Sequence, residues 1–193
     1  MGQRSQIYVR YQKDGANYLT ARYYQWNYGE RMISRCRHSL EWIEGMMSYD
    51  WYFTRETEKL KRILDVNFDM HDIMIGYDII KEWEECDYKE ETSFTEYVFL
   101  TQDNNDGKLF IDIKDGVMKY AFLDRDCNIN RVMSAAQYMK WDSPSWRKSE
   151  HIDDEQKALC EVNIKAIKKL AKLMTKEEVE EFINADYESI PKF

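Results

Sequence analysis

The chain has 193 residues, of which 44% are hydrophobic and 33% charged. This composition is typical of a globular protein large enough to bury a core. No apolar run approaches the roughly 20 residues of a membrane-spanning helix. The first ten residues also lack the apolar stretch of a secretory signal, so we expect a cytoplasmic protein.

The net charge of −8 is distributed unevenly. Residues 1–40 carry a net charge of +5, residues 41–100 carry −10, and residues 101–193 carry −3. The acidic middle disfavours binding of duplex DNA, because phosphate contacts need basic side chains. It favours a basic protein partner, although solubility alone also explains an acidic surface.

The N-terminal segment predicts a β-hairpin. Residues 7–12 and 18–26 alternate in β-forming side chains, and Asp14-Gly15 between them favours a tight turn. On the second strand Tyr23 falls on one face, and Tyr24 and Trp26 fall on the other.

Two helical segments are expected next. Between residues 30 and 47 apolar side chains recur at steps of three and four, which indicates an amphipathic helix. Residues 54–85 show a similar pattern, in which Gly76 marks a kink or a division. This second segment runs into the acidic sequence KEWEECDYKEE.

The second half of the chain predicts a β-meander followed by two helices. Strands are expected at 94–102, 108–114 and 117–124, while residues 131–141 fit either a strand or a helix. A helix capped by Asp153 or Asp154 should follow, with apolar residues at Leu159, Val162, Ala166, Leu170 and Leu173. Thr175 and Glu178 then form a capping box, so a short helix begins at Lys176.

These elements predict an α+β fold. We expect an antiparallel sheet, made of the N-terminal hairpin and the three-stranded meander, with central helices and a C-terminal helical pair. Residues 1–150 would form the α+β domain. Residues 151–193 would pack on it as a helical segment within one structural unit.

Two groups of residues are candidates for contact with a partner. The first group is acidic and comprises Glu82, Glu84, Glu85, Asp87, Glu90 and Glu91. The second group is aromatic and basic and comprises Arg22, Tyr24, Trp26, Arg31 and Arg35. Aromatic and Arg side chains dominate protein interfaces, but they equally serve as core and as intramolecular ion-pair partners.

Catalytic and metal motifs are missing from the sequence. We find no phosphate-binding loop, dinucleotide fingerprint or nucleophile elbow, and we expect no cofactor. Four widely separated cysteines exclude the paired spacing of a structural zinc site, so we also expect no metal site. Two carboxylate groups remain open as alternatives: a metal-dependent nuclease centre at Asp65, Asp69 and Asp72, and a loose cation site at Asp103 and Asp106.

The strings MGQRSQIYVRY and YQWNYGERMISR resemble those of small proteins from phages, prophages and mobile elements of Firmicutes. The likeness covers roughly the first 45 residues and implies no catalytic residues. In size, charge and context the chain is similar to type II-A anti-CRISPR proteins, which inhibit Cas9. The resemblance therefore implies an accessory protein that works in the cytoplasm of a bacterial host.

The resulting hypothesis is a protein that acts by binding rather than by catalysis. Cas9 holds nucleic acid in positively charged channels, which an acidic surface could occupy so that DNA is excluded. We therefore expect evasion of host defence through a Cas9–guide RNA complex, without binding of membranes or duplex DNA. The alternatives are the nuclease described above and a phage structural or assembly subunit.

Overall fold

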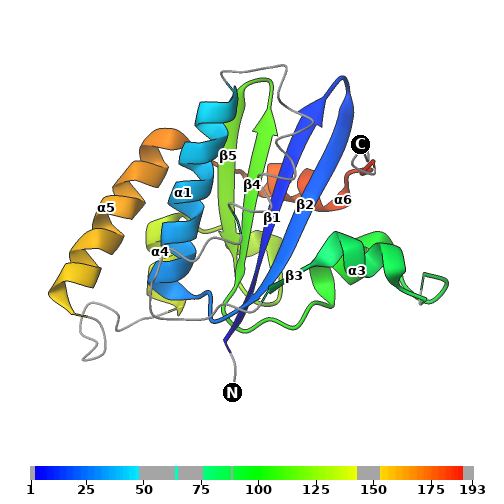
Figure 1. Cartoon of the computed structure of the whole chain (residues 1–193), viewed down its shortest axis with the longest axis horizontal. Helices are drawn as coiled ribbons and strands as arrows, with labels where there is room; N and C mark the ends of the chain where they lie inside the picture. The colour runs from blue at the N-terminus through cyan, green and yellow to red at the C-terminus, as the bar shows by residue number, and fades with distance from the viewer. Residues whose placement is uncertain (1–2, 48–63, 65–75, 88, 143–152, 189–193) are drawn as a thin grey trace.

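A six-stranded mixed sheet forms the middle layer of the molecule, with strand order β3-β2-β1-β4-β5-β6 (Figure 1). A computed structural model describes residues 3–47, 64, 76–87, 89–142 and 153–188. The strands are β1 (Arg4–Lys13), β2 (Ala16–Gln25), β3 (Gly76–Asp78), β4 (Lys108–Lys114), β5 (Val117–Leu123) and β6 (Lys172–Leu173). The α+β class is confirmed.

Two predicted hairpins are present. β1 pairs with β2 and β4 pairs with β5, both antiparallel. Asp14 and Gly15 have φ angles of 53° and 84°, and Asp115 and Gly116 have 51° and 72°. Two successive positive φ angles give a turn whose twist matches that of the flanking strands.

The prediction of a purely antiparallel sheet is wrong. β1 and β4 are central strands that run parallel, with Ile7 opposite Leu109 and Arg10 opposite Asp112. Both strands are buried on both faces, as parallel strands usually are. The prediction rested on the order of strands and helices along the chain, which does not show that β1 and β4 pair across the intervening helices.

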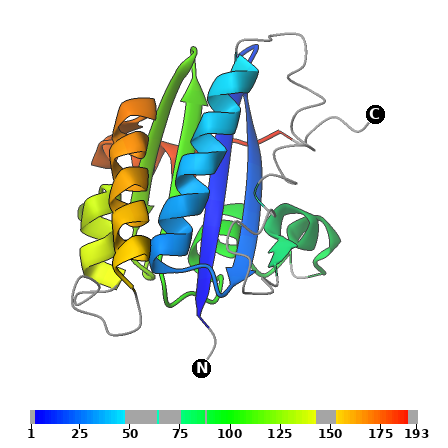
Figure 2. The ribbon, with the colours of Figure 1, turned by 60° about the vertical axis from the view of Figure 1, so that its left-hand side comes forward.

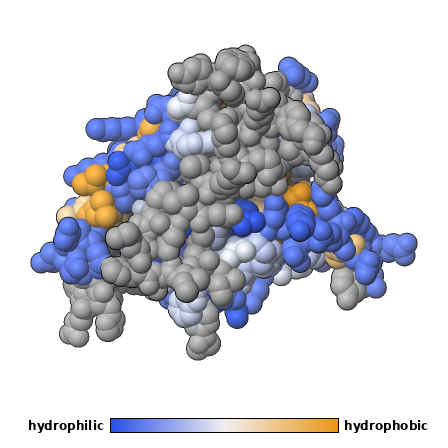
Figure 3. Space-filling model, in the orientation of Figure 1, coloured by the Kyte–Doolittle hydropathy of each residue, from blue (hydrophilic) through white to orange (hydrophobic). Residues whose placement is uncertain are grey.

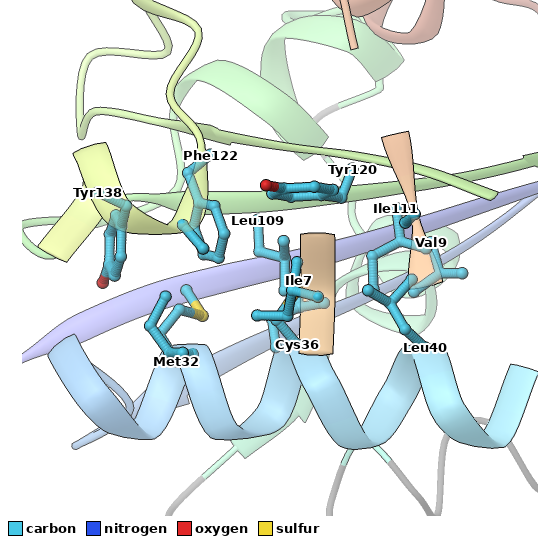
Figure 4. Close-up of a cluster of buried hydrophobic side chains, with 14 of the residues drawn as sticks. Ile7, Val9, Met32, Cys36, Leu40, Leu109, Ile111, Tyr120, Phe122 and Tyr138 are labelled. Atoms are coloured by element: carbon cyan, nitrogen blue, oxygen red, sulfur yellow. The ribbon is translucent and has the colours of Figure 1, made fainter. Parts of the chain in front are cut away.

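Three helices lie on the first face of the sheet: α1 (Gly29–Met47), α4 (Ala135–Asp142) and α5 (Asp154–Leu170). Figure 2 shows α1 and α5 side by side over the strands. In the core beneath them, Met32, Cys36 and Leu40 point from α1 toward Ile7 and Ile111 (Figure 4). All five side chains are fully buried. The predicted apolar stripe of this helix is therefore confirmed.

The second face carries a more aromatic core under α3 (Ile79–Glu85), the π-helix η2 (Glu96–Leu100) and α6 (Lys176–Asn184). A short 3-10 helix, η3 (Ile129–Arg131), lies next to α6. Phe110 of β4 stacks with Tyr8 at 5.0 Å between ring centroids and meets Phe182 edge-on at 5.2 Å. Phe99 of η2 lies against the same group, 4.9 Å from Tyr8.

The strand predicted at 94–102 is instead the π-helix η2. The last carbonyls of a helix have no partner within it, and here two of them accept bonds from buried sheet side chains. The Tyr8 hydroxyl donates to the Val98 carbonyl at 2.8 Å, and Lys108 Nζ donates to the Phe99 carbonyl at 2.6 Å. Burial lowers the pKa of Lys108, and its bond to the carbonyl offsets part of the cost of an ammonium group in this position.

A buried ion pair ties the two central strands to α6. Arg10 donates two bonds of 2.8 Å to the Asp112 carboxylate and a third of 2.7 Å to Glu181. Its guanidinium also lies 4.8 Å from the centre of the Phe182 ring. These contacts explain how Arg10 can be 1% exposed, because a buried charge must be paired and hydrogen-bonded.

The structure also describes parts of three other predicted segments. Residues 131–141, left open between strand and helix, form the helix α4 from Ala135, and Met133 before it makes an isolated bridge with Phe122. Residues 76–85 form β3 and α3, whereas most of the rest of the predicted helix at 54–85 lies outside the described residues. The capping boxes of Asp153 with Gln156 and of Thr175 with Glu178 are both present, so the C-terminal helical pair is confirmed.

Candidate protein-binding surface

Residues 78–87 and 89–96 form a projection at one side of the sheet, which we call the acidic lobe (Figure 1). The lobe consists of α3, the turn after it and the start of η2, and its sequence carries a net charge of −6. Asp78 begins α3 as its N-cap, accepting bonds from the amides of Ile80 at 3.0 Å and Lys81 at 3.2 Å. The amide of Cys86 closes the other end by donating to the Trp83 carbonyl at 3.2 Å.

The structure brings the six acidic candidates together on this lobe. All six are exposed, and the space-filling view is hydrophilic over α3 (Figure 3). They are Glu82, Glu84, Glu85, Asp87, Glu90 and Glu91. Two lysines partly offset the charge: Lys81 lies 3.7 Å from Glu85, and Lys89 Nζ donates to the backbone carbonyl of Glu84. These two lysines face eight acidic residues in the same segment, so the lobe keeps a net negative charge.

Aromatic contacts fix the lobe to the sheet. Ile79 is fully buried, and Trp83 meets Phe94 edge-on at 5.8 Å and Tyr97 at 5.4 Å. Lys89 covers the same Trp83 ring at 5.7 Å. Because the helix is anchored through its inner side, the backbone that carries its carboxylates is held in place. Such preorganisation lowers the entropic cost of binding.

Exposed apolar side chains flank the acidic lobe. Tyr77 on β3 is 38% exposed, and Leu100 at the end of η2 is 51% exposed. The Tyr77 ring stacks on Tyr23 at 4.5 Å, and its hydroxyl donates to Gln102 at 3.0 Å. In protein interfaces, aromatic and apolar residues form the centre and polar residues form the rim.

The aromatic and basic candidates do not form one surface. Tyr24 is fully buried and its hydroxyl donates to the Leu64 carbonyl at 2.7 Å. Arg35 is 4% exposed, donates to Asn27 at 3.1 Å and lies 4.9 Å from the centre of the Tyr24 ring. These two side chains hold β2 and α1 together.

The other three candidates lie nearer the surface. Trp26 is 41% exposed at a left-handed backbone position with φ of 64°. Arg31 donates to the Trp26 carbonyl at 3.0 Å and lies over the Tyr28 ring at 5.2 Å. Arg22, on β2, is half-buried. The corner between β2 and α1 thus divides into an interior part and an exposed turn.

A polar pocket of about 270 Å³, which the sequence did not predict, lies at the end of the sheet where β4 begins and β5 ends. Its lining comprises Asn105, Asp106, Asp124, Arg125, Asp126, Arg131, Trp141 and Asp142. Burial raises the pKa of Asp106 to about 6. Burial, and then the negative charge of Asp106, raises the pKa of Asp142 to about 7. The only sequence signal for this pocket is the position of aspartates in the loops at strand ends.

Two carboxyl groups of this pocket make hydrogen bonds and an ion pair within the protein. Asp106 accepts the amide of Arg4 at 2.6 Å. Asp124 accepts the amide of Asn128 at 3.0 Å and pairs with Arg131 at 3.4 Å. Within the described part of the chain, no three His, Cys, Asp or Glu residues are placed to hold a metal ion. Asp103 of the predicted loose cation site pairs with Arg4 at 2.6 Å. Asp65, Asp69 and Asp72 lie outside the described residues.

Three of the four cysteines are buried in the structure. Cys36, Cys127 and Cys160 are buried, and Cys86 is half-buried. Burial raises the pKa of the Cys127 thiol and raises the pKa of Cys160 to about 12. A thiol with a raised pKa is a poor nucleophile, because the reactive species is the thiolate.

Comparisons with protein-family models, with curated proteins and with solved structures found no match to this chain. Among the described helices, none is both long and apolar enough to cross a membrane.

Proposed function

We propose that this protein acts by binding, and that the acidic lobe is its contact surface for a basic partner. The observation that carries the proposal is the set of six exposed carboxylates on one anchored helix-and-turn. Their negative field would steer a basic surface toward the lobe and fix its orientation. Tyr77 and Leu100 would supply the apolar contacts that a charged surface alone lacks.

The best specific candidate for the partner is a host defence nuclease, with the Cas9–guide RNA complex first. Support comes from the resemblance of residues 1–45 to small phage and mobile-element proteins, and from the positive channels in which Cas9 holds nucleic acid. An acidic lobe seated in such a channel would exclude target DNA. No catalysis by this protein is required, since occupancy alone blocks the nuclease.

The proposal is tested by pull-down of Cas9 on the full chain, with and without guide RNA, followed by a DNA-cleavage assay. We expect retention of Cas9 and slower cleavage. The variant Glu82→Gln/Glu84→Gln/Glu90→Gln should lose both effects, because it removes three charges from the lobe. No retention and no inhibition across several Cas9 orthologues would exclude Cas9 as the partner.

A matched control separates the lobe from the overall charge. Asp115→Asn/Glu180→Gln/Glu188→Gln removes the same number of exposed carboxylates from other parts of the chain. We expect this control to bind and inhibit like the unaltered protein. Equal losses in the two triple variants would show that net charge, rather than the acidic lobe, determines binding.

A further inference from the structure

Helix α5 exposes an apolar strip that its own fold does not cover. α5 buries Cys160, Asn163 and Ile167 against the rest of the molecule, whereas the apolar residues Leu159 and Val162 lie outside this buried side. Leu159 remains 55% exposed and Val162 remains 52% exposed. Ala158 and Ala166 lie one turn to either side of Val162 on the same side of the helix. The space-filling view shows apolar side chains over the region of α5 (Figure 3).

The two halves of α5 differ in net charge. Asp153, Asp154, Glu155 and Glu161 outnumber Lys157 in the first half, while Lys165, Lys168 and Lys169 lie in the second half without an acidic residue. Favourable interaction with the helix dipole accounts for charges in the first and last turns. It does not account for the exposed apolar residues between them, which lower solubility unless something covers them.

The pattern around Val162 is complementary to itself when it is reversed. Glu155 and Lys169 are each seven residues, or about two helical turns, from Val162. Ala158 and Ala166 are each four residues from it. Two antiparallel copies of α5 crossing at Val162 would therefore place Ala158 opposite Ala166 and Glu155 opposite Lys169. The small alanines would allow close approach, and each charge pair would occur twice.

We propose that this face of α5 binds a second copy of the same chain, giving a two-fold symmetric dimer with an antiparallel α5–α5 contact. The charge complementarity selects this occupant, because an acidic half and a basic half at equal distances from one apolar centre fit a reversed copy of themselves. The interface is small, so the dimer forms in a concentration-dependent equilibrium. The proposed dimer does not depend on the function proposed for the acidic lobe.

The dimer would place its two acidic lobes far apart. Both ribbon views show α3 and α5 on opposite sides of the sheet (Figures 1 and 2). An α5–α5 contact therefore leaves both acidic lobes free and directed away from the two-fold axis. Such a dimer would offer a partner two binding surfaces.

The first test is sedimentation velocity of the full chain from about 5 to about 500 µM, at low and high salt. The mass should rise from 23.4 kDa toward twice that value, and the rise should be weaker at high salt. Val162→Asp should abolish it, because two carboxylates would face each other across the axis. The matched control is Val117→Asp, at a valine 40% exposed on β5, and it should dimerise normally. A chain that is monomeric throughout, or a dimer insensitive to Val162→Asp, would overturn the proposal.

A charge exchange tests the antiparallel geometry itself. Glu155→Lys and Lys169→Glu should each weaken the dimer about tenfold, because each reverses two ion pairs. The double variant should restore the affinity, since every pair is re-formed with its signs exchanged. Failure of the double variant to recover, with all three variants folded by circular dichroism, would contradict this arrangement.

Discussion

The two faces of the sheet are built by different means. Under α1, the core is mainly aliphatic where Cys36 and Leu40 meet Ile7 and Ile111 of the strands. Under η2, α3 and α6 the core is more aromatic and contains the charged side chains of Arg10 and Lys108. Both faces contain buried polar contacts, such as the bond from Arg35 to Asn27 on the first face. On the second face, however, a buried guanidinium and a buried carboxylate depend on each other, so this face should be more sensitive to loss of a single partner.

The largest expected effect is on the second face. Arg10→Ala leaves the carboxylate of Asp112 buried without its partner and should lower the free energy of unfolding by about 3–5 kcal/mol. Chemical denaturation measures this change. Arg125→Ala, at an exposed arginine, should change stability by less than about 0.5 kcal/mol. A loss below about 1 kcal/mol for Arg10→Ala would show that the ion pair is dispensable.

The corresponding change on the first face is Leu40→Ala. Leu40 is fully buried between α1 and the sheet, so its truncation leaves a cavity. We expect a loss of about 3 kcal/mol in the same denaturation experiment. A loss larger than that of Arg10→Ala would reverse the proposed order of sensitivity between the two faces.

A substitution at Asp142, in the pocket at the end of the sheet, should stabilise the protein. The pKa of Asp142 is raised from 3.8 to about 7 in the folded protein. The folded state therefore binds this proton more tightly than the unfolded state, and its contribution to stability is lost as the pH rises from about 4 to about 7. Asp142→Asn removes this dependence and should stabilise the protein by about 2 kcal/mol at pH 8.

The same substitution should give no stabilisation at pH 4, where the native carboxyl group is already protonated in the folded state. Thermal melting at both pH values measures the difference. Asp126→Asn provides a control, because Asp126 lines the same pocket but is exposed. Equal stabilisation by Asp142→Asn at pH 4 and pH 8 would show that proton binding is not the cause.

The smallest predicted effect concerns the π-helix. Tyr8→Phe keeps the buried ring but removes the hydroxyl that donates to the Val98 carbonyl. The carbonyl then lacks this donor, so we expect a loss of about 1–2 kcal/mol in chemical denaturation. Hydrogen exchange should also become faster at the amide of Thr101, which donates to Glu96 within η2. Unchanged exchange would mean that η2 does not depend on Tyr8.

Local signals in the sequence predicted much of the fold. Asp14-Gly15 specified its turn, and Thr175 with Glu178 specified the start of α6, because the side chains that determine these features are neighbours in the chain. The parallel pairing of β1 and β4 could not be predicted in this way. It joins residues far apart in sequence, such as Arg10 and Asp112.

The sequence predicted an exposed candidate surface only where charged residues lie close together in the chain. The six carboxylates of the acidic lobe are close in sequence and share a short helix and turn, so they are also close in space. Tyr24 and Arg35 show no local sign of burial, which results from their contacts with Leu64 and Asn27. Alternation along β2 placed Tyr23 and Tyr24 on opposite faces, but both faces are covered.

The central claim is that the acidic lobe binds a basic partner. The most direct measurement is titration of the Cas9–guide RNA complex with the unaltered protein and with Glu82→Gln/Glu84→Gln/Glu90→Gln, each at low and high salt. We expect the unaltered protein to bind more tightly, with an affinity that falls as salt rises, and we expect the variant to lose most of both the affinity and the salt dependence. Equal affinities and equal salt dependence for the two proteins would contradict the claim.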